Sequence, residues 1–85
     1  MDAMTIAIET MIDEFKVQLD GRLTDRQRII DHLLDLRLVS AEHPVLLAEV
    51  DRLLANVPGL TVVETSWWSS ELERLSAVVA AAPVA

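Results

Sequence analysis

The sequence predicts an all-α protein, a small antiparallel bundle of about four helices with a short extended segment before the last helix. Two observations support this fold class. Apolar residues recur at the spacing of an amphipathic helix in four separate stretches of the chain. Glycine, proline and asparagine lie between most of these stretches, where they end helices and form short connections.

The first helix is expected from about residue 3 to residue 19. One apolar stripe runs along it, formed by Met4, Ile8, Met11, Ile12, Phe15 and Leu19. Glu9, Asp13 and Lys16 lie mostly away from that stripe. Gly21 follows the helix, and a glycine there can adopt the left-handed conformation that closes a helix C-terminus.

The second helix has a start signal at Thr24. Thr24 and Gln27 have the spacing of a capping box, in which each side chain accepts a hydrogen bond from a free backbone N–H. The apolar arc that follows is broad and contains Ile29, Ile30, Leu33, Leu34 and Leu36. His32 falls on the opposite, polar side, beside the carboxylates of Asp31 and Asp35.

The third helix is expected to begin with Ser40 as its N-cap. Pro44 is tolerated in the first turn because the N–H groups there have no acceptor within the helix. The apolar face consists of Leu46, Leu47, Val50, Leu53 and Leu54. Pro58 and Gly59 then stop the helix.

Residues 60–65 differ from the rest of the chain because most of them are β-branched and favour an extended backbone. No other segment has the pattern of a strand. A lone strand would leave its backbone groups unpaired, so we expect an extended connection whose valines fill the core. The alternative is a strand that pairs with its own copy in a second subunit.

The fourth helix has a second capping box, formed by Ser70 and Glu73, although a start near Ser66 is also compatible with the pattern. Its apolar stripe consists of Trp68, Leu72, Leu75 and Val79, and Val78 borders it. Pro83 is expected to end the helix and to leave the last few residues loose.

The chain has 85 residues, which predicts a single domain over residues 1–85. A domain of this size has a marginal core, and the absence of cysteine excludes disulfides and thiolate metal sites. The apolar fraction is nevertheless 52%. We therefore expect part of the apolar surface to lie against another molecule, either a second copy in a homodimer or another protein.

The net charge of −7 disfavours direct binding to nucleic acid or to an anionic membrane, because both are recognised largely through Lys and Arg. Acidic residues near the start do not fit a signal peptide, and no apolar run reaches the ~18 residues of a membrane span. A cytoplasmic protein is expected on these grounds.

No set of residues predicts catalysis or a cofactor. His32 and Asp35 could supply two metal ligands, but a site needs three or four, so His32 is interpreted as a surface residue beside solvated carboxylates. The serines near the last helix have no nearby base or oxyanion site in the pattern. We expect no enzyme, no bound metal, no cofactor and no small-molecule substrate.

Arg22, Arg26 and Arg28 form the only basic cluster, whereas the first helix is acidic. The simplest explanation is attraction between the first two helices, together with local pairs between Arg28 and its neighbouring aspartates. The alternative is a contact with an acidic partner.

Trp67 and Trp68 are the most informative pair. Neighbouring residues on a helix point about 100° apart, and on a strand they point to opposite faces. If Trp68 fills the core, Trp67 must face elsewhere, either covering the edge of the core or binding a partner. Tryptophan is enriched at interaction hot spots.

These observations favour a protein–protein interaction or assembly module that pairs with itself. The candidate contact residues are Trp67, Trp68, Val62, Val63, Met4 and Ile8. The alternative is a transcription-regulator-like helix-turn-helix protein over residues 24–63, or an acidic decoy that acts on a nucleic-acid-binding partner. The acidic third helix argues against a helix that reads the major groove.

Overall fold

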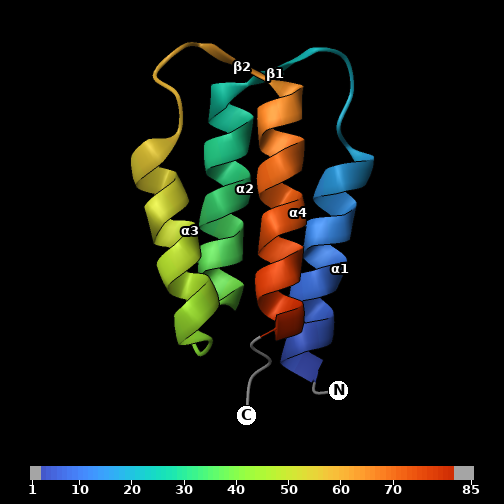
Figure 1. The fold of residues 1–85 in the computed structure, drawn as a ribbon, viewed down its shortest axis with the longest axis vertical. Coiled ribbons are helices and arrows are strands. Elements are labelled where there is room, and N and C mark those ends of the chain that lie inside the picture. The colour runs from blue at the N-terminus through green and yellow to red at the C-terminus, as the bar shows by residue number, and fades with distance from the viewer. Residues whose placement is uncertain (1–2, 82–85) are drawn as a thin grey trace.

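The computed structural model describes residues 3–81 and confirms the all-α class. The helices in those residues are α1 (Ala3–Val17), α2 (Arg26–Val39), α3 (Pro44–Asn56) and α4 (Thr65–Ala81). They run up and down as a bundle in which α1 and α3 each pack on both α2 and α4 (Figure 1). Pro83 and the chain end predicted to be loose lie outside the described residues.

The core is built from the apolar stripes of all four helices. Its buried helical residues are Ile8, Ile12, Phe15, Ile29, Leu33, Leu36, Leu46, Val50, Leu53, Trp68, Leu72, Leu75 and Val79. Most residues of the stripes read from the sequence are therefore buried as expected, and the others are partly buried at their edges. Leu34 is the exception, because 47% of it remains exposed at the edge of the broad arc of α2.

A two-stranded sheet closes one end of the bundle (Figure 1). Strands β1 (Leu23–Asp25) and β2 (Val62–Glu64) are antiparallel, and Thr24 pairs with Val63 at the centre. The expectation of an unpaired extended connection at residues 60–65 was wrong. The partner strand lies about forty residues away along the chain, in a segment whose composition does not suggest a strand.

The sheet also moves the start of α2. Thr24 is in β1, where its hydroxyl oxygen lies 2.8 Å from that of Thr65, so it cannot form the predicted capping box. Asp25 is the N-cap instead, and its carboxylate accepts a hydrogen bond from the Gln27 N–H at 3.0 Å. Gly21, with φ of 70°, turns the chain from α1 into β1.

The connection between α2 and α3 also differs from the prediction. Ser40 ends α2 as its C-cap, with its hydroxyl donating to the Leu36 carbonyl oxygen, rather than starting α3. His43 is the N-cap of α3, and its Nδ1 accepts a hydrogen bond from the Leu46 N–H at 3.1 Å. Pro44 follows in the first turn, as expected.

Helix α4 begins at Thr65, which confirms an early start and makes Ser70 an interior residue. The Thr65 N–H donates to the Arg22 carbonyl oxygen at 2.9 Å, next to the paired strands. The order helix, strand, helix thus occurs twice, over residues 3–39 and 44–81. The sequence shows no repeat, so this symmetry is one of topology only.

The predicted attraction between the first two helices is not seen, since no ion pair joins α1 to α2 within residues 3–81. Lys16 of α1 instead pairs with Glu73 of α4 at 2.9 Å. Arg37 and Asp51 connect α2 to α3 at 2.7 Å. A further network connects α3 to α4 and contains Glu49, Arg52, Glu71 and Arg74.

Candidate interaction surface

The two tryptophans have different environments. Trp68 is fully buried at the centre of the core, whereas Trp67 is partly buried and packs against the edge of the core. Their ring centroids are 6.4 Å apart. The sequence argument that the two rings must face different surroundings is therefore confirmed, and Trp67 is the one that reaches the surface.

Trp67 lines an apolar hollow at the sheet end of the bundle, which we call the Trp67 groove. The groove has a volume of about 430 Å³ and is lined by Leu23, Pro58, Leu60, Val62, Val63, Glu64 and Trp67. Leu60 is 71% exposed and Leu23 is 54% exposed, so apolar side chains project beside the hollow. This local gathering of exposed apolar groups on a small acidic protein is typical of a contact site.

The candidate residues named from the sequence are not all brought together. Val62 and Trp67 line the groove and are accessible. Val63 also lines the groove, but only 4% of it is exposed. Trp68 and Ile8 are core residues with 0% exposure, so a partner cannot reach them in this fold. Met4 is partly buried in the first turn of α1, and α1 begins at the end of the bundle opposite the sheet (Figure 1).

Leu23, Pro58 and Leu60 were missed because their place in the groove depends on the sheet. Leu23 lies opposite Glu64 across the strand pair, and the burial pattern of β1 turns Leu23 outward while Thr24 points inward. The only sequence signal was the Leu-Thr-Asp run itself, which is too short to identify as a strand without its partner.

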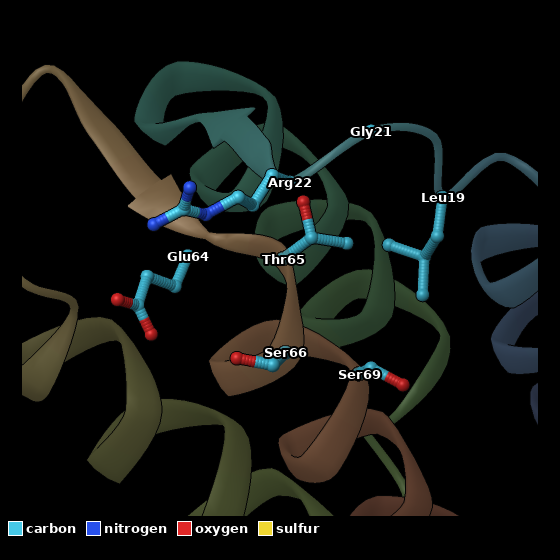
Figure 2. Close-up of a pocket in the computed structure, with 7 residues that line it drawn as sticks. All are labelled: Leu19, Gly21, Arg22, Glu64, Thr65, Ser66 and Ser69. Atoms are coloured by element: carbon cyan, nitrogen blue, oxygen red, sulfur yellow. The ribbon is translucent and has the colours of Figure 1, made fainter.

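A second hollow of about 590 Å³ lies beside the same sheet and is lined by Leu19, Gly21, Arg22, Glu64, Thr65, Ser66 and Ser69. Figure 2 shows Arg22 and Glu64 extending from the strand ends on one side, with Ser66 and Ser69 on the first turns of α4. No histidine lines this hollow, so neither serine has a base to activate it. The negative charge of the Glu64 carboxylate opposes the positive charge of Arg22, which makes the hollow a poor site for an anion.

His32 is the group with a perturbed pKa. Its ring stacks on Phe15 with centroids 4.0 Å apart, and lies 6.4 Å from the Trp68 ring. Burial lowers the pKa of His32 below its ordinary value, with Arg28 adding to the effect and the nearby aspartates opposing it. The prediction of a surface histidine is therefore only partly correct, because His32 is partly buried and the Phe15 ring of α1 stacks on it.

The Nδ1 atom of His32 is buried and has no hydrogen-bond partner in the described part of the chain. The Nε2 of His43 and the indole N–H of Trp68 are in the same condition. These three nitrogens lie within the packed bundle and do not converge on either hollow. They are therefore features of the core, where an unpaired polar atom lowers the stability of the fold.

The helix–strand–helix order invites a comparison with the EF-hand, whose calcium loop of about 12 residues has a glycine at the sixth position. With Gly21 at that position, the first ligand would be Lys16 and the last would be Gln27, so an ammonium group and an amide replace carboxylates. Asp20 is the one carboxylate at a ligand position. These residues do not fit calcium, and residues 3–81 contain no cluster of three or more potential metal ligands.

The described helices are too short or too polar to span a bilayer. The chain matches no model of a known protein family, and the searches of curated proteins and of solved structures gave no match either. The class that the fold defines is a four-helix bundle, over the described residues, that is closed at one end by a two-stranded sheet.

Proposed function

We propose that this chain is a non-catalytic protein–protein interaction or assembly module that associates with itself through the Trp67 groove. The observation that carries the proposal is the position of Trp67, a partly buried indole beside the exposed side chains of Leu23, Leu60 and Val62. A large aromatic anchor within an apolar hollow is the usual centre of a contact surface.

The driving force would be burial of this apolar surface, at about 25 cal/mol per Å² before the cost of ordering the partners. A domain of this size buries little apolar surface in its own core, so covering an exposed apolar end also stabilises the fold. The groove is already formed in the single chain, which keeps the reorganisation needed for association small.

The test is the molar mass in solution, measured by light scattering and sedimentation over a wide concentration range. The wild type is expected to show concentration-dependent dimers, and Trp67→Ala is expected to remain monomeric at the same concentrations. Leu38→Ala is the matched control, because Leu38 is 78% exposed on α2 and does not line the groove. A wild-type chain that stays monomeric throughout would reject self-association.

An acidic decoy is the second candidate, favoured by the carboxylates on the outer side of α1. Glu9, Asp13 and Glu14 have no ion-pair partner among residues 3–81. Such a face would attract a basic nucleic-acid-binding protein at low salt. Salt-dependent binding of a lysine-rich peptide, lost in a Glu9→Gln, Asp13→Asn, Glu14→Gln variant, would support it.

Direct DNA reading by a helix-turn-helix is less compatible with the arrangement of α2 and α3. These helices lie side by side as an antiparallel hairpin rather than crossing at a steep angle (Figure 1). Arg52, the basic residue of α3, is held by Glu49 at 3.1 Å. We expect no shift of duplex DNA in a gel, and a salt-dependent shift would favour the regulator hypothesis instead.

A further inference from the structure

Arg22 and Glu64 are two opposite charges without an ion-pair partner in the described chain, and they lie at the same end of the bundle. Both are exposed, and Figure 2 shows their side chains extending to the same side from neighbouring strand ends. Most other basic side chains are held in place: Lys16 by Glu73, Arg26 by the Pro58 carbonyl oxygen, Arg37 by Asp51, and Arg52 and Arg74 by Glu49.

Glu64 borders the Trp67 groove, and Arg22 borders the hollow next to it. Glu64 lines both the groove and the neighbouring hollow that contains Arg22, and it lies opposite Leu23 in the sheet. The end of the bundle therefore carries an apolar hollow, projecting leucines, one cation and one anion close together. A twofold contact between identical surfaces requires this composition, because each surface must supply both members of every pair.

The charge distribution also favours this end for contact between two copies. Each copy has a net charge of −7, so two copies repel each other at most orientations. The segments at the sheet end, residues 18–26 and 57–66, carry three carboxylates and two guanidinium groups. The molecule is 37 Å long, and an end-to-end arrangement keeps most of the α1 carboxylates farther apart than the ~8 Å screening length at physiological salt.

The size of the end limits the strength of such a contact. The two shorter dimensions of the molecule are 24 and 18 Å, so an end-to-end contact buries less than the roughly 800 Å² per partner of a standard interface. The expected dimer is therefore a weak and reversible one, visible by its dependence on concentration.

We infer that the occupant of the Trp67 groove is a second copy of this chain, bound end to end by a twofold axis that places Arg22 of each copy against Glu64 of the other. This inference rests on the proposed self-association and specifies its geometry. The paired charges fix the orientation of the contact, while the apolar groove supplies most of the affinity.

Charge reversal with complementation tests the pairing. Arg22→Glu alone and Glu64→Arg alone should each weaken self-association by roughly tenfold or more, because like charges then face each other in both halves of the contact. An equimolar mixture of the two variants should recover wild-type affinity as a heterodimer, since each charge then meets its opposite. Recovery in the mixture cannot come from a pair within one chain.

Arg28→Glu is the matched control, because Arg28 is exposed, has no ion pair among the described residues and does not line either hollow. Thermal unfolding of each variant checks that the bundle is intact. If the wild type dimerises through Trp67 but the charge variants and their mixture associate like wild type, the pairing is overturned while the proposed function stands. If the wild type does not dimerise, both fail together.

Discussion

The imidazole ring of His32 lies nearly parallel to the phenyl ring of Phe15, with 4.0 Å between their centroids and 5° between their planes. The stack joins α2 to α1, and the His32 ring also approaches the core residue Trp68. His32 is thus part of the packing between three helices, although the sequence places it on a polar face among carboxylates.

This stack predicts that acid destabilises the protein through His32. Burial lowers the pKa of His32 from 6.5 in the folded chain, so the unfolded chain binds more protons as the pH falls through 6.5. The contribution of the neutral His32 ring to the free energy of unfolding is complete above pH 6.5 and is lost progressively below it. The free energy of unfolding of the wild type, minus that of His32→Phe, should therefore decrease between pH 7.5 and pH 5. An NMR titration showing the ring protonating above pH 6.5 would contradict this.

The two tryptophans should differ sharply in their effect on stability. Trp68 is fully buried, so Trp68→Ala should lower the free energy of unfolding by about 3–5 kcal/mol, which approaches the whole stability of a small domain. Trp67→Ala should have less than half that effect. Trp68→Phe should be milder than Trp68→Ala, because the phenyl ring fills more of the space that the buried indole occupies and leaves a smaller cavity. Urea unfolding measures all three, and equal losses at the two positions would refute the burial difference.

The start of α2 gives a test of which residue caps the helix. Asp25→Ala should lower the free energy of unfolding by about 1 kcal/mol, because the Gln27 N–H loses its acceptor. Asp25→Asn retains a side-chain oxygen and should stay within a few tenths of a kcal/mol of wild type. No loss in Asp25→Ala, measured by urea unfolding at neutral pH, would show that Asp25 is not the cap.

The hydrogen bond between the Thr24 and Thr65 hydroxyls, 2.8 Å long, should give a coupled response to substitution. Thr24→Val should cost about 1 kcal/mol, because it leaves the Thr65 hydroxyl without its partner near the sheet. The double variant Thr24→Val, Thr65→Val should recover part of that loss, since neither position then has an unpaired hydroxyl. Additive losses in a double-mutant cycle would show that the two hydroxyls do not interact.

Much of the fold can be predicted from the sequence because helix formation and burial are local. The stripe of Ile8, Ile12 and Phe15 is set by residues three and four positions apart, and these residues can face the core only from a helix. Helix boundaries were less accurate, because caps such as Asp25 and His43 depend on where the neighbouring segment lies. The candidate site was predicted only in part, through Trp67, Val62 and Val63.

The sequence by itself determined four amphipathic helices, an acidic surface and the separation of Trp67 from Trp68, because each follows from residues close together in the chain. Only the tertiary structure decided that residues 23–25 become a strand, that Leu23 and Leu60 join Trp67 at one groove, and that His32 is partly buried against Phe15. Each of these depends on contact between segments far apart in sequence. Such contacts have no local pattern, because the backbone pairing of a short strand and the burial of one ring are set by what packs against them.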